Sequence, residues 1–332
     1  MAAHEIQTSA AARKAYLDLW NKSGVTVASS TYSGPGPVSS AFEDAVRAIG
    51  QAYAYLSALD GELFLVRKAE DIERIYKMDK HGIILDFQNT LAFGEDLDRI
   101  DTFFNLGLRM VQLTYNLQNL VGAGCTEPHG GGLTIFGREV VRHLNESGIL
   151  IDVSHCNEQT AFDALKASND PIIISHGSSK AVCYHDRGRS DELAKAVADR
   201  GGYFGVNIIP GFISASTEVT LDDFAQHVEH LVDLIGIDHV GIGTDKAGPG
   251  PGTESLIEYP ENMPNQQPGT FEYSGFRREE HRLTSNYHLK GYDNFGDWPN
   301  LTVHLAKRGF NEEELRKILG LNFLRIFREV VG

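Results

Sequence analysis

Two histidines and one aspartate stand at equivalent places in the sequence and could together bind a metal ion. His155 ends the run IDVSH, and His176 ends the run IIISH, 21 residues later. Asp245 ends the run VGIGTD. Two imidazoles and a carboxylate suit zinc or another divalent ion. Such an ion lowers the pKa of its bound water and polarises a carbonyl group, so the set predicts hydrolysis of an amide or related bond. Asp245 is either the third ligand or the general base.

Each of these residues follows a short apolar run of strand length, and segments of helical periodicity lie between the runs. The apolar runs are nearly continuous, as in strands that are covered on both faces. The expected strands are residues 25–29, 83–87, 110–114, 149–153, 172–175, 203–207 and 239–242. The clearest expected helices are residues 136–144, 157–168 and 221–234.

Repeated strand–helix units predict a parallel α/β sheet, either open or closed into a barrel. The sequence contains no GxGxxG after its first strand, which disfavours an open dinucleotide-binding sheet. We therefore expect a (β/α)8 TIM-like barrel forming a single domain over residues 1–332, with a degenerate N-terminal strand near residues 4–8. Residues 249–299 are expected to form a lid or crossover segment, and residues 300–330 to form C-terminal helices. The two histidines and Asp245 would then meet at the C-terminal edge of the barrel, where barrel enzymes place catalytic groups.

Composition excludes several classes of protein. The chain of 332 residues carries 30 Lys and Arg against 45 Asp and Glu, a net charge of −15, which repels nucleic acid. No apolar run approaches the ~20 residues that cross a bilayer, and the N-terminus lacks the apolar region of a secretory signal. The three cysteines have no CxxC spacing and are odd in number, which suits a reducing compartment. We expect a cytoplasmic protein with a small-molecule substrate.

Long stretches of the chain resemble the membrane dipeptidase (renal dipeptidase, peptidase M19) family of the amidohydrolase superfamily. The resemblance rests on GIILDFQNT (82–90), LGLRMVQLTYNLQNLVGAGCTE (106–127), GGLTIFGREVVRHLNESGILIDVSHC (131–156), HDRGRSDEL (185–193), TLDDFAQHVEHLVDLIGIDHVGIGTD (220–245) and PNLTVHLAKRGFNEEELRKILGLNFLRIF (299–327). It implies a (β/α)8 barrel, often a homodimer, with a two-zinc site that hydrolyses dipeptides, including D-residue and dehydro substrates.

The resemblance also implies roles for individual residues. The histidines of the family's second metal match His155 and His176, and its carboxylate at the end of the last strand matches Asp245. The arginine that binds the substrate carboxylate best matches Arg187, with Arg189 close by. A guanidinium group can bind a free carboxylate through two parallel hydrogen bonds.

Three departures from the family pattern change the expected metal content. The HxD pair that ligates the first metal is absent near residues 5–8, the bridging glutamate is replaced by Gln88, and the substrate-contacting histidine is replaced by Tyr115. An amide oxygen is neutral and cannot bridge two cations as a carboxylate does. Of the family's three carboxylates only Asp245 remains, so we expect one divalent metal ion, with zinc the first choice, and we expect Gln88 and Tyr115 to orient the substrate.

The sequence therefore predicts a dipeptidase-like metal-dependent hydrolase that cleaves an amide or other C–N bond of a small, carboxylate-bearing substrate. Water attacks the carbonyl, Asp245 takes its proton, and Arg187 anchors the substrate. One alternative is a catalytically silent barrel that binds a small acidic ligand or a protein partner. Another is a single-metal decarboxylase or lyase on the same scaffold.

Overall fold

The computed structural model describes residues 6, 8–246, 273–277, 279–283 and 287–332. Its strands are β1 (Val27–Ser33), β2 (Leu63–Leu65), β3 (His81–Phe87), β4 (Leu108–Gln112), β5 (Leu150–Asp152), β6 (Ile173–Ser179), β7 (Gly188–Arg189), β8 (Tyr203–Val206), β9 (Glu218–Thr220), β10 (Val240–Ile242) and β11 (His288–Lys290). Its α-helices are α2 (Ala10–Ser23), α3 (Ala41–Ala58), α4 (Ala69–Lys77), α5 (Asp98–Asn105), α6 (Ile135–Ser147), α7 (Glu158–Ala167), α8 (Asp191–Asp199), α9 (Pro210–Ile213), α10 (Leu221–Ile235), α11 (Trp298–Lys307), α12 (Glu312–Arg316) and α13 (Asn322–Val331).

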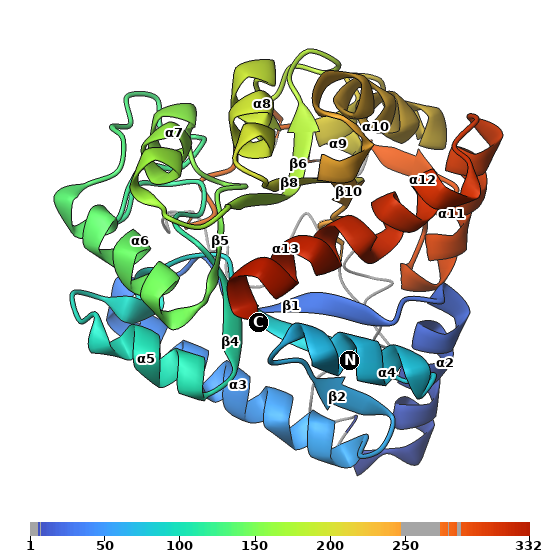
Figure 1. The fold of residues 1–332 in the computed structure, drawn as a ribbon, viewed down its shortest axis with the longest axis horizontal. Helices are drawn as coiled ribbons and strands as arrows, with labels where there is room; N and C mark the ends of the chain where they lie inside the picture. Colours follow the sequence, from blue (N-terminus) through green and yellow to red (C-terminus); the bar gives the residue numbers. More distant parts are fainter. Residues whose placement is uncertain (1–5, 7, 247–272, 278, 284–286) are drawn as a thin grey trace.

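The fold is a (β/α)8-type barrel, as expected. Parallel strands follow one another in the order β1-β3-β4-β5-β6-β8-β10, while β2 and β7 pair with β3 and β6 at the side. Each of the seven strands in this path overlaps one of the seven that the sequence predicts. Figure 1 shows helices α5, α6, α7, α8 and α10 arranged around the outside of the strands. This arrangement explains the continuous apolar runs, because both faces of the sheet are covered.

The expected strand near residues 4–8 is absent from the described chain. Ile6 and Thr8 are helical, and the other residues of that window lie outside the described ranges. The first described strand is β1, and no hydrogen-bonded ladder joins it to β10 at the other edge of the sheet. A window of five residues with one strongly apolar side chain gives only a weak indication of a strand. The described residues of this window are helical instead, like helix α2 that follows them.

The barrel interior is apolar at its N-terminal end. Ile84, Met110, Leu150, Ile173 and Tyr203 come from five strands and form a buried cluster there. Helix α13 crosses this end in front of the strands (Figure 1) and adds Ile326 and Phe327 to the same cluster. Helix α13 therefore covers one end of the barrel, and the C-terminal ends of the strands face the other way.

Local sequence signals fix the helices that follow the barrel strands. The Thr134 side chain accepts a hydrogen bond from the Gly137 amide at the start of α6, which ends at Gly148 with a φ of 67°. Thr220 and Asp223 form a capping box at the start of α10. In the expected C-terminal helices, α11 ends before Gly309, and the helix after it is interrupted by a π-helical turn at Lys317–Leu321.

None of the described helices combines the length and apolar character needed to cross a membrane. Cys125, Cys156 and Cys183 are free thiols. Most of the expected lid or crossover segment, residues 249–299, lies outside the described ranges, and its described part includes β11, which pairs with β9.

Candidate functional site

The structure brings His155 and His176 into direct contact, as their spacing predicts. Their Nε2 atoms are 3.0 Å apart, although the residues lie on two successive strand–helix units. Both side chains are buried, with 1% and 6% of their surface exposed. The two rings meet edge to face, with centroids 5.1 Å apart. The imidazoles therefore point one nitrogen each at a shared position.

The other ring nitrogen of His155 is held by an asparagine. Its Nδ1 lies 2.7 Å from Oδ1 of Asn116. The Asn116 amide group is oriented by two more contacts, because its Nδ2 donates to the Ser274 carbonyl and its Oδ1 accepts from the Cys125 thiol. An amide oxygen only accepts, so Nδ1 of His155 carries the proton and Nε2 keeps its lone pair.

His176 is oriented through a serine and a buried aspartate. Ser175 donates its hydroxyl proton to Asp152, and Oγ of Ser175 lies 2.7 Å from Nδ1 of His176. With Asp152 ionised, the single hydroxyl proton of Ser175 is used on the carboxylate, so Nδ1 of His176 must donate to Oγ. Its Nε2 then also keeps a lone pair. This is the usual way in which outer hydrogen bonds fix the tautomer of a metal-binding histidine.

Burial and nearby arginines keep both imidazoles neutral. Burial lowers the pKa of His155 and of His176 well below the ordinary value, and the positive charges of Arg187 and Arg189 lower both further. Metal ligation requires neutral imidazole. The electrostatic surroundings therefore favour the form that can bind a metal ion.

Asp245 lies beside the histidine pair in a strained backbone conformation. Its Oδ1 is 3.8 Å from Nε2 of His176. Its φ of 55° is in the left-handed region, which a non-glycine residue adopts at a cost of about 1–3 kcal/mol and which is common at functional sites. Burial raises the pKa of Asp245 to about 6, an effect that Arg187 and Lys246 partly offset. The carboxylate is therefore a stronger base than an exposed aspartate.

The donor set fits a metal ion at the two imidazoles but is not a preformed three-ligand cage. Two nitrogens bound tetrahedrally to one zinc ion at 2.0–2.1 Å lie about 3.3–3.4 Å apart, so the observed 3.0 Å would have to widen by a few tenths of an ångström. Within the described ranges, no group of three or more His, Cys, Asp or Glu is arranged to hold a metal ion. Asp245 would have to approach the pair to act as the third ligand.

Arg187 lies behind the histidines and is completely buried. Its Nη1 donates to the Ser154 carbonyl, and its Nη2 donates to the His176 carbonyl at 3.0 Å. Its Nε has no hydrogen-bond partner among the described residues. The guanidinium group thus holds the backbone of the site, and Arg187 is not among the residues that line the large cavity described below. Its neighbour Arg189 is buried in the same way, with hydrogen bonds to the carbonyls of Cys156 and Asp186.

Tyr115 and Gln88 both lie at the mouth of the barrel. The ring of Tyr115 stacks on His155, with centroids 4.1 Å apart, and is half-buried. Gln88 directly follows β3 and lines the same cavity as His176 and Asp245. Their predicted role in orienting substrate remains a prediction.

A cavity of about 1440 Å³ extends from Gln88, His176 and Asp245 into the barrel. Its wall includes three polar side chains that the sequence analysis did not single out, namely Asp86, Gln112 and Asp152. Only Asp245 had been counted as a carboxylate at the site, so the structure adds two more. Their signal in the sequence was their inward register, since Asp86 precedes Gln88 by two residues and successive side chains of a strand alternate between faces.

A described part of the 249–299 segment packs against the site. The Ser274 carbonyl binds Asn116, and the Phe276 ring meets Tyr115 edge to face at 6.4 Å. His281 is buried, and its Nε2 lies 3.1 Å from Asp186. This segment therefore contacts the residues that orient His155.

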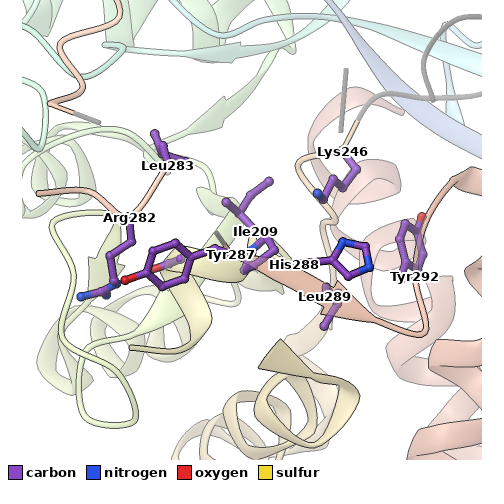
Figure 2. Close-up of a pocket in the computed structure, with 10 residues that line it drawn as sticks. Ile209, Lys246, Arg282, Leu283, Tyr287, His288, Leu289 and Tyr292 are labelled. Atoms are coloured by element: carbon purple, nitrogen blue, oxygen red, sulfur yellow. The ribbon is translucent and has the colours of Figure 1, made fainter. Parts of the chain in front are cut away.

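A second, separate cavity is too small for an organic substrate. It measures about 20 Å³, room for about one water molecule. Figure 2 shows Lys246, His288 and Tyr292 at one side of it and Arg282 and Tyr287 at the other. Arg282 is already bonded to the carbonyls of Gly211 and Tyr184. The large cavity is therefore the candidate substrate site.

The chain is similar to proteins of one known family. The model of the family described as membrane dipeptidase (peptidase family M19) matches residues 14–263 and 283–331. Among curated proteins, dipeptidase tcpJ of Claviceps purpurea is 28% identical over 269 residues, which are 80% of this chain and 55% of the relative. An uncharacterized dipeptidase of Schizosaccharomyces pombe is 33% identical over 52% of this chain and 45% of its own length. The chain thus spans about half the length of these curated relatives.

Solved structures share the fold over nearly the whole chain. An amidohydrolase from Pseudomonas aeruginosa is 31% identical with a TM-score of 0.81, and the alignment covers all of both chains. A metallopeptidase from Rhodobacter sphaeroides, solved with a phosphinate mimic of the dipeptide L-Ala-D-Ala, is 20% identical with a TM-score of 0.79, covering 95% of this chain and 89% of the other. At that identity the second likeness shows the fold alone.

Proposed function

The chain belongs to the membrane dipeptidase family, peptidase family M19, and we propose that it is a hydrolase that cleaves an amide bond of a small, dipeptide-like substrate with one divalent metal ion. The observation that carries this proposal is the 3.0 Å approach of two Nε2 atoms whose partner Nδ1 atoms are already hydrogen-bonded. Two lone pairs that face each other repel unless a proton or a metal ion lies between them, and the lowered pKa of both imidazoles disfavours the proton.

His155 and His176 would hold the ion, with Asp245 as the adjacent carboxylate. Zinc is our first choice because two imidazoles and one carboxylate are typical of its catalytic sites. A divalent ion supplies two things here, a lowered pKa for a water molecule and polarisation of the scissile carbonyl. Asp245 would act as general base toward a water molecule at the site, because burial has raised the pKa of its carboxyl group to about 6.

The remaining residues bind and orient the substrate. Arg187 carries a positive charge close to the histidine pair and has a buried Nε without a partner among the described residues, so a substrate carboxylate would reach it only if the surrounding side chains moved. Tyr115 covers one face of His155 and limits how a substrate can approach the pair. Gln88 offers an amide to the peptide group from the end of β3. The cavity of about 1440 Å³ is large enough for a dipeptide.

A panel of L,L-, L,D- and dehydro-dipeptides, assayed with added zinc or manganese, tests the proposal. We expect hydrolysis by the wild type, inhibition by a phosphinate mimic of L-Ala-D-Ala, and loss of activity in His155→Ala and His176→Ala. His129→Ala removes an exposed histidine and serves as the matched control. Unchanged turnover in both histidine variants would show that this site takes no part in the reaction.

A second candidate function is ligand binding without catalysis. It is favoured by the lack, in the described part of the chain, of a ready three-ligand group. Saturable binding of the phosphinate mimic together with no turnover of any dipeptide, at every metal tested, would support it.

Location and assembly are further proposals. Three free cysteines suit a reducing compartment, so we propose a cytoplasmic location. A homodimer is proposed from the family resemblance and is testable by light scattering.

A further inference from the structure

Asp86 is a buried carboxylate that the proposed reaction does not use. It lies on β3, two residues before Gln88, and lines the large cavity. Its Oδ1 accepts a hydrogen bond of 2.8 Å from Thr31 on the neighbouring strand β1. The charges that act on it come from two further carboxylates, Asp152 and Asp245. A buried carboxylate without a positive partner is costly, so this position favours a cationic ligand.

Gln112 provides an independent sign of a missing ligand. Its side chain is 4% exposed and lines the same cavity. Its Oε1 is buried and has no hydrogen-bond partner among the described residues. Buried polar atoms are nearly always paired, so a hydrogen-bond donor is expected at this place.

The strand register places these two acceptors on neighbouring strands, offset from each other by two residues. Asp86 is level with Met110 on β4, and Gln112 lies two residues further along that strand. Residues two apart on a strand share a face, so both side chains face the barrel interior. Asp152, level with Gln112 on β5, is already saturated by Ser154 and Ser175. Asp86 and Gln112 are therefore the side chains whose oxygen atoms can still accept hydrogen bonds from a ligand.

We propose that Asp86 and Gln112 form a subsite for the cationic end of the substrate, a primary ammonium or guanidinium group on an aliphatic stem. Both groups combine positive charge with several N–H donors, which matches a carboxylate next to an amide oxygen. A metal ion fits this place less well, because a hard cation needs six or more oxygen ligands. No group of three acidic, histidine or cysteine ligands is arranged for a metal within the described residues.

The depth of the subsite sets the length of the stem. At about 3.3 Å per residue, Asp86 lies roughly 6–7 Å deeper along its strand than Gln88 at the mouth, whereas Gln112, which follows the partner of Phe87, lies nearer the mouth. The four-carbon stem of a lysine-like side chain spans such a distance. Ile84, Met110 and Tyr203 form the apolar wall below. Cleavage of the bound molecule rests on the proposed function, whereas its binding at this subsite does not.

Matched dipeptides test the subsite. Gly-Lys is compared with Gly-norleucine, and Lys-Gly with norleucine-Gly, each in L and D forms, because norleucine keeps the stem and lacks the ammonium group. For at least one pair, we expect the kcat/KM of the wild type to be ten- to hundred-fold higher for the lysine peptide than for its norleucine counterpart. This is the usual effect of a hydrogen-bonded charge. Asp86→Asn should reduce that ratio to within threefold, and Gln112→Met should reduce it by a smaller factor. Asp60→Asn removes an exposed carboxylate and should leave the ratio unchanged.

Binding separates failure of the subsite from failure of the proposed function. The same peptides are titrated by calorimetry at pH 8 into His155→Ala, alone and combined with Asp86→Asn. Preferential binding of a lysine member that depends on Asp86 supports the subsite even if no peptide is cleaved. Equal binding of both members overturns it even if both are cleaved. Binding of Mg²⁺ or Ca²⁺ alone that requires Asp86, without preference for lysine, also overturns it in favour of a metal site.

Discussion

Replacing Asp86 by asparagine should stabilise the folded protein at alkaline pH. Burial, with the nearby charges of Asp152 and Asp245, raises the pKa of Asp86 from 3.8 to about 7. The folded state therefore holds this proton more tightly than the unfolded state does. Stability from this group is complete below the unfolded pKa of 3.8 and is lost as pH rises towards 7. Asparagine has nearly the same shape, can still accept from Thr31, and has no proton to lose.

The pKa shift sets the size of the effect. A shift of about 3 units at 1.36 kcal/mol per unit corresponds to about 4 kcal/mol when complete. Between pH 4.5 and pH 8 the free energy of unfolding of Asp86→Asn should rise relative to wild type by about 3 kcal/mol.

Urea unfolding at pH 4.5, 6 and 8 measures the difference. Chelator is present throughout, so that metal binding does not add its own pH dependence. Asp60→Asn, which alters an exposed carboxylate, should follow the wild type at every pH. If the difference in free energy of unfolding between Asp86→Asn and wild type stays constant from pH 4.5 to 8, burial does not raise the pKa of the Asp86 carboxyl group.

Three further variants probe the residues around the histidine pair. Ser175→Ala removes the hydrogen bond to Nδ1 of His176 and should weaken metal binding about 10–100-fold in equilibrium dialysis; an unchanged affinity would contradict the proposed orientation of the ring. Asp245→Asn should lower kcat for a cleaved dipeptide by about 10²–10⁴-fold with metal supplied at saturation, and a smaller loss would exclude Asp245 as general base. Arg187→Met leaves the carbonyls of Ser154 and His176 without donors and should lower the free energy of unfolding by about 2–4 kcal/mol; no loss in urea unfolding would show that these contacts are dispensable.

The barrel strands could be predicted because their signal is local. Each is a short apolar run bounded by polar or turn residues, and the helix between two runs fixes parallel pairing. The expected strand near residues 4–8 had no such run, and the described Ile6 and Thr8 are helical. The lack of a hydrogen-bonded ladder between β1 and β10 is a property of the whole sheet, so it could not be predicted from any single segment of the sequence.

The meeting of His155, His176 and Asp245 was predictable because parallel strands end at one edge of a barrel. The buried position of Arg187 was not, since it depends on carbonyl groups presented by two different strand ends. Asp86 was missed because it lies one layer inside the end of β3, and Gln112 because it fell inside the expected strand 110–114, whereas β4 ends at Gln112. An aspartate or glutamine inside an otherwise apolar barrel strand is the signal that would have found them.

The central claim is that His155 and His176 share one divalent cation, and metal analysis tests it most directly. The protein is purified without chelator and its metal content is measured by plasma mass spectrometry, beside His155→Ala, His176→Ala and the control His129→Ala. We expect close to one divalent ion per chain in the wild type and the control, and a much lower metal content in both site variants. A folded wild type without a stoichiometric ion, or an ion retained in both site variants, would contradict it.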